Sequence, residues 1–173
     1  PTNDFLVTGK RHPLAYDYEV GYDDDGRVTG LKLMLAANCG WSADLSGPVA
    51  DRAVFHVDNA YFLGDVEIVS YRCKTNVQSH TAFRGFGGPQ GMIVTESILG
   101  DIARALGKDP LDVRKVNLYG TSERNVTHYQ MPVEDNILAP LIARLEQTAQ
   151  YRQRGAEIAR WDATSPVSRR RLG

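Results

Sequence analysis

The stretch Thr81-Ala82-Phe83-Arg84-Gly85-Phe86-Gly87-Gly88-Pro89-Gln90-Gly91 marks the point where the chain changes from strand-like to helical sequence. A glycine-rich loop that opens a helix can point successive backbone N–H groups at an anion. It is not a dinucleotide fingerprint, because Gln90 stands where that motif needs glycine, and no Gly-Lys pair of a phosphate-binding loop follows. A tight turn with close helix packing explains the glycines equally well, so both interpretations stay open.

Two side chains of this loop favour a ligand. Arg84 carries a forked cation that suits phosphate or carboxylate groups. Phe86 stands between glycines, where no local packing pattern demands an aromatic ring, and such a ring can offer a flat face to a planar ligand. The residues alone therefore predict a site for a planar ligand that is anionic or rich in carbonyl groups.

Upstream of the loop the side chains follow the two-residue period of half-buried strands. Residues 15–22 and 27–37 alternate in this way, and the turn between them, Asp23-Asp24-Asp25-Gly26, predicts an antiparallel hairpin. Residues 49–58 suit one or two helical turns, and a third strand is expected over 65–77.

Downstream of the loop the pattern is helical. Apolar residues recur every four positions from Val94 to Leu106, with Pro89 at the expected first turn and Gly107 just past the end. Asp109 and Pro110 predict the start of a second helix that runs to about residue 119, and a third is expected over 136–160.

These patterns predict an α+β fold in which antiparallel β-strands are followed by a glycine-rich loop and two to three packed helices. We expect a single domain over 1–173, mainly β over 1–80 and mainly α over 81–160, with a tail over 161–173. The tail contains Arg169-Arg170-Arg171, interpreted as a solvated linker rather than a nucleic-acid arm.

Composition excludes several classes of protein. The 173 residues hold 20 basic and 21 acidic side chains, a net charge of −1, which gives no electrostatic case for nucleic acid. No stretch approaches the ~20 apolar residues of a membrane span. Cys39 and Cys73 lack zinc-ligand spacing. A disulfide between them stays open but has no support in the pattern, and we expect reduced thiols in the cytoplasm. The four histidines match no metal motif, and no direct metal ligand is expected. The first residue is Pro1, and the beginning matches no signal peptide, which suggests a fragment.

Arg52 is a second candidate for a binding residue. It lies in or beside a short apolar helical turn, where an ordinary surface arginine would pair with a neighbour such as Asp51. Alternatively, its guanidinium points into a pocket and stabilises negative charge on a substrate oxygen.

The glycine-rich string and several other segments of the chain resemble xanthine dehydrogenases in their molybdenum-binding part. The glycine-rich string is highly specific, and the match runs in family order from about residue 9 to residue 119. Trp41-Ser42-Ala43-Asp44-Leu45-Ser46 resembles the separate large subunit of bacterial enzymes. The other matching segments are Gly9-Lys10-Arg11-His12-Pro13, Arg52-Ala53-Val54-Phe55-His56-Val57-Asp58-Asn59-Ala60-Tyr61, Cys73-Lys74-Thr75-Asn76 and Arg114-Lys115-Val116-Asn117-Leu118-Tyr119.

The resemblance implies a molybdenum hydroxylase that oxidises hypoxanthine or xanthine to urate on a molybdopterin cofactor. It implies 2Fe-2S clusters and FAD bound elsewhere, in an iron–sulfur/FAD subunit of the same enzyme, and no nucleic-acid or membrane partner. By the same resemblance Arg52 and Phe86 contact the purine, whereas Arg84, with Phe83 and Gly85 beside it, contacts the cofactor. Arginine at position 52 favours a purine over an aldehyde.

The chain departs from the family pattern in one important respect. The family's catalytic glutamate lies further towards the C-terminus of the full subunit, and no glutamate here lies in a matching motif. We therefore expect no catalytic residue in this segment and no turnover by the chain alone. The alternatives are another molybdenum hydroxylase that acts on aldehydes or N-heterocycles, and a non-catalytic stand-alone binding domain.

Overall fold

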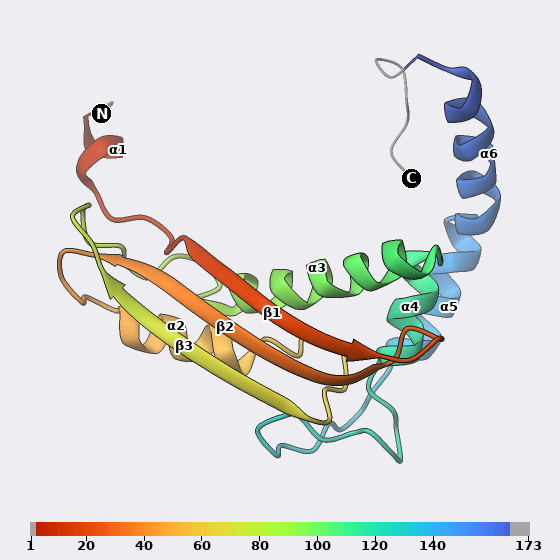
Figure 1. Ribbon diagram of the computed structural model, residues 1–173, viewed down its shortest axis with the longest axis horizontal. Helices are drawn as coiled ribbons and strands as arrows, with labels where there is room; N and C mark the ends of the chain where they lie inside the picture. Colours follow the sequence, from red (N-terminus) through yellow and green to blue (C-terminus); the bar gives the residue numbers. More distant parts are fainter. Residues whose placement is uncertain (1–2, 167–173) are drawn as a thin grey trace. The chain divides into compact units, whose positions relative to one another are not determined.

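The computed structural model describes residues 3–166 (Figure 1). The run Arg169-Arg170-Arg171 lies outside them. In chain order the elements are α1 Asp4–Val7, β1 Leu14–Tyr22, β2 Val28–Gly40, α2 Ser46–Phe55, β3 Val66–Lys74, α3 Gly88–Leu106, α4 Pro110–Asn117, α5 Leu138–Thr148 and α6 Tyr151–Thr164.

The chain divides into two compact units, residues 1–134 and 135–173. The first contains the sheet and α1 to α4, and the second contains α5 and α6. Helix α2 lies inside the segment expected to be mainly β, and α6 continues through Thr164, past the expected start of the tail at residue 161.

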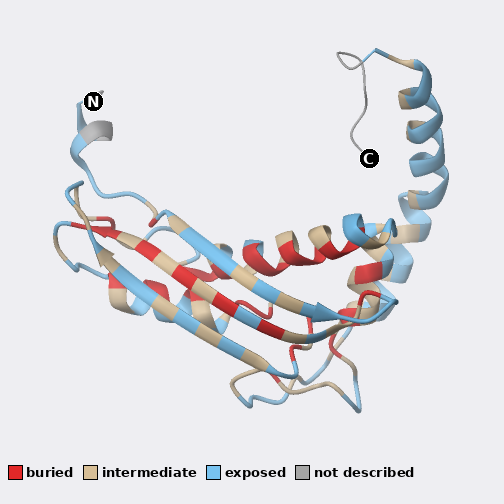
Figure 2. Cartoon of the chain, viewed as in Figure 1, coloured by how far each residue is buried: buried red, intermediate tan, exposed pale blue. Residues whose placement is uncertain are grey.

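Strands β1 and β2 form the predicted antiparallel hairpin, with Tyr18 opposite Leu33 and Val20 opposite Leu31. The turn also forms as expected, because the Asp23 carboxylate accepts the backbone N–H groups of Asp25 and Arg27. The alternation of side chains predicted from the sequence therefore places the β2 leucines on the buried face, visible as alternating buried residues in Figure 2.

The α+β class is confirmed, but the sheet is mixed rather than purely antiparallel. The strand order is β1-β2-β3, and β3 runs parallel to β2, with Leu33 opposite Ile68. The cause is α2, which lies between the two strands in the sequence. A chain that returns along a crossover helix re-enters the sheet in its original direction, so the pair becomes parallel.

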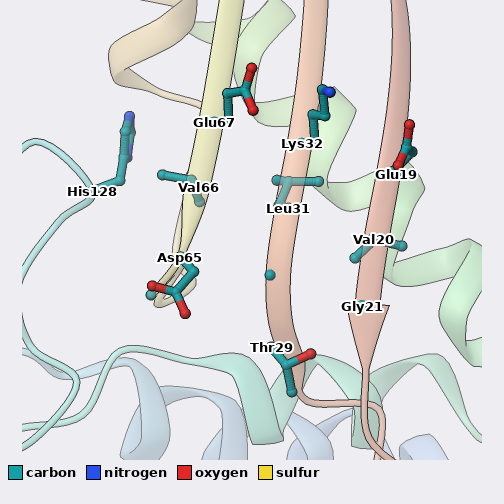
Figure 3. A pocket seen from close by; sticks show the side chains of 12 residues that line it. Glu19, Val20, Gly21, Thr29, Leu31, Lys32, Asp65, Val66, Glu67 and His128 are labelled. Carbon is teal, nitrogen blue, oxygen red and sulfur yellow. The ribbon is translucent and has the colours of Figure 1, made fainter.

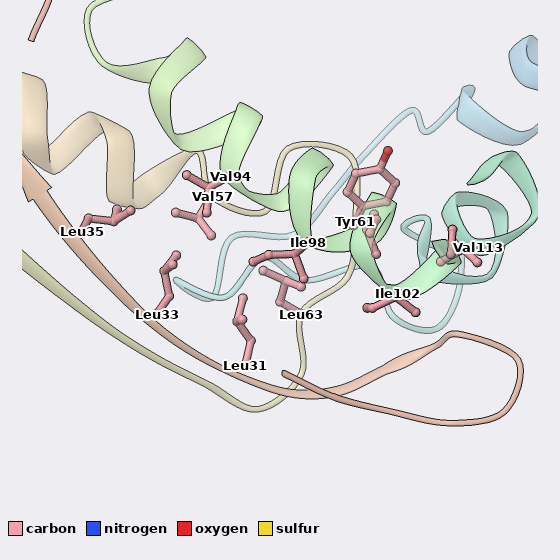
Figure 4. Close-up of a cluster of buried hydrophobic side chains, with 12 residues drawn as sticks. Leu31, Leu33, Leu35, Val57, Tyr61, Leu63, Val94, Ile98, Ile102 and Val113 are labelled. Atoms are coloured by element: carbon pink, nitrogen blue, oxygen red, sulfur yellow. The ribbon is translucent and has the colours of Figure 1, made fainter. Parts of the chain in front are cut away.

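The core lies between one face of the sheet and helices α2 and α3. Leu31, Leu33 and Leu35 from β2 are at most 5% exposed and face Ile98 and Ile102 of α3 (Figure 4). Burying an aliphatic side chain of this size contributes ~1.5–3 kcal/mol each. The four-residue repeat read from the sequence is therefore the face that packs against the sheet.

The helix boundaries expected around α3 and α4 are confirmed. Pro89 lies in the first turn of α3, and Gly107 ends that helix in a left-handed conformation. Asp109 caps α4 by accepting the N–H of Leu111 at 2.8 Å, and Pro110 begins the helix. Each boundary follows from local chemistry that the sequence displays directly.

The helix expected over 136–160 is two helices, α5 and α6. The break falls at Gln150, whose φ of 52° is left-handed and cannot continue a right-handed helix. The Gln150 N–H instead donates to the carbonyl of Gln147 at 3.1 Å. No proline or glycine marks this position, so the sequence pattern alone predicts one continuous helix.

Helices α2 and α3 approach so closely that a side chain does not fit between their backbones. A Cβ atom on Gly87 would lie 2.0 Å from the carbonyl oxygen of Val49, and one on Gly91 would lie 2.1 Å from that of Ala53. Gly87 also has a φ of 95°. These two glycines therefore allow the N-terminal end of α3 to rest directly on α2.

Buried His12 fastens the segment before β1 to the start of α2. Its Nε2 atom lies 2.7 Å from the Ser46 hydroxyl oxygen, and His12 is 2% exposed. Burial lowers the pKa of His12 below its ordinary 6.5, nearby His80 lowers the pKa further, and Asp44 partly opposes both effects. The neutral imidazole is thus the form that the fold favours.

The close approach of α2 and α3 predicts that Gly87→Ala is strongly destabilising. Because the new Cβ would meet the Val49 carbonyl and φ is unfavourable, the free energy of unfolding should fall by about 3 kcal/mol. Gly100→Ala is the matched control in the same helix, because its Cβ would make only an ordinary contact at 3.6 Å. The control should gain ~0.5–1 kcal/mol. Urea denaturation measures both, and equal effects would contradict the packing argument.

The lowered pKa of His12 predicts a loss of stability in mild acid. The unfolded chain binds the proton better, so this contribution is complete above pH 6.5 and disappears as the pH falls through the folded-state pKa. Urea denaturation between pH 8 and 5 should show a falling free energy of unfolding. His12→Gln should have a smaller slope over the same range, and an unchanged slope would exclude His12 as the titrating group.

Candidate functional site

The glycine-rich loop makes a strained turn just before α3. Gly85, Phe86 and Gly87 have consecutive φ values of 92°, 49° and 95°. The Phe86 N–H donates to the Phe83 carbonyl at 2.7 Å, and the Gly88 N–H donates to the Gly85 carbonyl at 2.9 Å. A left-handed phenylalanine costs ~1–3 kcal/mol and persists only where surrounding contacts hold it.

Three backbone donors of this loop are unpaired within the described part of the chain, two of them on the exposed residues Arg84 and Gly85 and one on buried Gly87. Among residues 3–166, the N–H groups of Arg84, Gly85 and Gly87 have no hydrogen-bond partner. They lie immediately before α3, whose N-terminus adds partial positive charge. The loop therefore fits an anionic group, which would satisfy these donors.

Close packing explains the glycines at three positions of the loop. Gly87 and Gly91 are required by the contact with α2. Gly85 is exposed, but a Cβ atom on it would lie 2.6 Å from the Pro89 ring, and its φ is left-handed. The ligand interpretation rests instead on the unpaired N–H groups of the loop.

Arg52 lies on α2 with its side chain exposed and unpaired. It forms no ion pair or side-chain hydrogen bond with any residue between 3 and 166. The neighbour that an ordinary surface arginine would use, Asp51, is bound instead by Arg72 of β3. The Arg52 guanidinium is therefore free for a ligand.

The fold brings Arg52 and Phe86 to the same junction. A Cβ on Gly87, the residue after Phe86, would lie 3.2 Å from the backbone nitrogen of Ala53, the residue after Arg52. The two candidates for substrate binding, 34 positions apart in the sequence, thus flank one contact between α2 and the loop. Phe86 is half-buried there, which limits the orientations of its ring.

Arg84 and Phe83 lie at the exposed start of the loop. The Arg84 guanidinium has no partner within the described part of the chain, whereas its backbone carbonyl accepts the Nη2 donor of Arg11 at 2.6 Å. The Phe83 ring is 58% exposed, with the Arg11 guanidinium 4.7 Å from its centroid. Arg84 and Gly85 themselves carry two of the unpaired N–H groups, and Phe83 directly precedes them in the sequence.

Sequence reasoning missed the part played by Arg11. Arg11 belongs to a segment that resembles the family, but nothing in its local sequence pattern distinguishes it from other surface arginines. Its partners lie more than 70 positions away, so only the folded chain reveals them.

Glu96 is the acidic residue of α3 that lies nearest in sequence to the loop, and its carboxylate is already hydrogen-bonded. It accepts hydrogen bonds from Tyr61 at 2.6 Å, Asn59 at 3.0 Å and Arg114 at 2.8 Å. Burial raises the pKa of Tyr61, and its hydrogen bond to Glu96 raises that pKa further. A carboxylate held by three donors stabilises the helix packing and is poorly suited to act as a mobile base.

Residues 3–166 form neither a metal-binding cluster nor a membrane-spanning helix. Among residues 3–166 no three His, Cys, Asp or Glu side chains come together to hold a metal ion. Cys39 is buried, Cys73 is half-buried, and both are free thiols. No helix in this part of the chain is long and apolar enough to cross a bilayer.

An open groove of about 820 Å³ lies along the sheet, away from the glycine-rich loop (Figure 3). Glu19, Lys32 and Glu67 come from three neighbouring strands and lie side by side across it. His128 borders the groove, and its Nε2 atom lies 3.0 Å from the carbonyl oxygen of Val54. None of the site residues predicted from the sequence lines this groove.

Comparison with known proteins connects the chain to a cofactor-binding domain. The chain matches the model of the molybdopterin cofactor-binding domain over residues 2–118. The xanthine dehydrogenase of Drosophila subobscura is 42% identical over 159 residues, which are 92% of this chain and 12% of that protein. A nicotinate hydroxylase of Emericella nidulans is 35% identical over 161 residues, again 92% of this chain and 12% of that protein.

A solved structure supports the fold. The quinoline 2-oxidoreductase from Pseudomonas putida 86 superposes with a TM-score of 0.79 over 92% of this chain and 21% of that one, at 20% identity. The chain spans about one eighth of the length of the two curated relatives, the xanthine dehydrogenase and the nicotinate hydroxylase. The family model matches most of the first unit, including every predicted site residue. The chain therefore belongs to the family of molybdopterin cofactor-binding domains.

Proposed function

We propose that this chain forms one wall of the substrate and molybdopterin pocket of a molybdenum hydroxylase that oxidises hypoxanthine and xanthine to urate. The observation that carries this proposal is the unpaired Arg52 guanidinium beside the loop that holds Phe86. The identity with a xanthine dehydrogenase supports a purine substrate. The molybdopterin cofactor, when bound, supplies the redox and oxygen-transfer chemistry.

The cofactor is held, in this proposal, by the start of the loop. The free N–H groups of Arg84, Gly85 and Gly87 donate to an anionic part of the cofactor, and the Arg84 guanidinium adds a charged donor. The exposed Phe83 ring covers the adjacent apolar surface of the cofactor. These groups bind and orient the cofactor without ligating its metal.

The substrate is held by the two residues at the junction. Phe86 packs one face of its ring against the planar purine. Arg52 donates to an exocyclic oxygen of the purine and stabilises the negative charge that develops there, which is most effective where water is excluded. Neither residue moves a proton, so the general base comes from sequence outside this chain. The electrons leave through an iron–sulfur/FAD subunit that binds 2Fe-2S clusters and FAD.

We place this enzyme in the cytoplasm and in purine catabolism. The free thiols of Cys39 and Cys73 support a reducing compartment. The charge balance gives no reason to add a nucleic-acid partner.

A second candidate is a molybdenum hydroxylase that acts on another N-heterocycle or on an aldehyde. The 35% identity with a nicotinate hydroxylase favours this alternative. A pyridine carboxylate is also planar and anionic, so it fits the same pair of residues. The third possibility, a non-catalytic binding domain, needs the loop but not Arg52.

Arg52→Met distinguishes these substrates in the full-length enzyme that carries this chain. The loss of a preorganised donor to the developing charge should lower kcat/KM for xanthine by ~100- to 1000-fold. An aldehyde makes no comparable use of this donor, so its kcat/KM should change far less. Arg104→Met, at an exposed arginine paired with Asp101, is the control and should leave both unchanged. Equal losses for xanthine and aldehyde would contradict the purine role.

The proposed place of the general base outside this chain predicts that the isolated 173-residue chain does not turn over xanthine. The chain reconstituted with cofactor should form no urate above the rate without protein, followed by absorbance at the urate band. The full-length enzyme under the same conditions is the positive control. Urate formation by the isolated chain would overturn the assignment of the base to sequence outside it.

A further inference from the structure

Arg11 makes three contacts with the glycine-rich loop, and the proposed function gives it no role. Its Nη2 donates to the Arg84 carbonyl at 2.6 Å, and its Nη1 donates to the Gln90 side-chain oxygen at 3.3 Å. Its guanidinium lies over the Phe83 ring, 4.7 Å from the centroid. One side chain therefore contacts both the start of the loop and the first turn of α3.

Gln90 also donates a hydrogen bond back to the segment that carries Arg11. Its Nε2 donates to the His12 carbonyl at 3.4 Å, so the segment before β1 and the first turn of α3 exchange hydrogen bonds in both directions. The Thr81 N–H also donates to the Lys10 carbonyl at 3.1 Å. The loop is thus tied to the same segment at its first residue, Thr81, and near its end, at Gln90.

The segment that carries Arg11 is itself anchored. His12 is buried and bound to Ser46, the first residue of α2. Arg11 therefore connects the loop to the helix that carries Arg52. The strain in this loop lies at Phe86, because glycine adopts a positive φ without cost and phenylalanine does not, and external contacts help to hold that conformation.

The chemistry of the contacts requires arginine at this position. A guanidinium donates along two directions in one plane while its face stacks on an aromatic ring, and a lysine ammonium cannot do both. Arg11 also forms no ion pair with any residue between 3 and 166. Its charge therefore adds to that of Arg84 beside the free N–H groups of the loop.

We propose that Arg11 is a positioning residue for the cofactor-binding loop. It holds the Arg84 carbonyl and the Phe83 ring so that the N–H groups of Arg84, Gly85 and Gly87 face the cofactor before it binds. This inference rests on the proposed function of the loop. It adds that the strained loop is preorganised by a residue more than 70 positions earlier.

The first experiment measures the order of the loop in the full chain. The N–H groups of Phe86 and Gly88 are hydrogen-bonded within the loop, so amide exchange by NMR reports its closed form. Arg11→Ala should speed exchange at these two amides by about tenfold while core amides, such as that of Ile98, keep their rates. Arg11→Lys should restore only part of the protection. Lys10→Ala is the matched control, because among residues 3–166 its Nζ binds only the Thr8 carbonyl.

The second experiment measures release of the molybdopterin cofactor from the full-length loaded enzyme. Arg11→Ala should speed release by about tenfold, since an unordered loop binds less well. Arg84→Ala tests the proposed function separately: it removes the guanidinium but keeps the carbonyl that Arg11 holds. It should therefore speed release without changing amide exchange in the loop.

The two variants separate the possible failures. Faster release from Arg84→Ala, with unchanged exchange and release for Arg11→Ala, would overturn the role of Arg11 and leave the proposed function standing. Faster exchange for Arg11→Ala without faster release would also overturn the positioning role. Unchanged release for both variants would refute the cofactor site itself and this inference with it.

Discussion

The direct contact between the backbones of α2 and α3 is the constraint on which the site depends. Because Gly87 and Gly91 have no side chains, the carbonyl groups of Val49 and Ala53 lie where Cβ atoms would otherwise stand. The loop before α3 is thereby placed beside the exposed face of α2. A bulkier residue at either glycine would separate the helices, and Arg52 would no longer share a junction with the loop.

Within the described residues, the arginines near the loop are unpaired, whereas two other arginines of the first unit pair with carboxylates. Arg72 and Arg114 pair with the carboxylates of Asp51 and Glu96. In contrast, Arg11, Arg52 and Arg84 form no ion pair within residues 3–166. A net charge of −1 for the whole chain conceals this local excess of cations. Three unpaired guanidinium groups beside free N–H groups make the junction complementary to anionic ligands.

Much of the fold could be predicted because its signals are local. The hairpin follows from alternating side chains around a turn rich in aspartate, and the limits of α3 and α4 follow from Pro89, Gly107 and Asp109. The direction of β3 was missed, because the strand pattern itself carries no direction and the helical turns expected over residues 49–58 were not taken as a crossover. The break at Gln150 was also missed, because no residue type there favours a left-handed conformation.

For the candidate site, the sequence by itself determined the glycine-rich loop and the residues that resemble a molybdenum hydroxylase, Arg52, Phe83, Arg84, Gly85 and Phe86. Only the tertiary structure decided that Asp51 is bound by Arg72, which leaves Arg52 free, and that Arg11 holds the loop. The physical reason is the range of the interactions. Periodicity, capping and turn preferences act over a few residues, whereas ion pairs and side-chain hydrogen bonds join segments that become neighbours only when the chain folds.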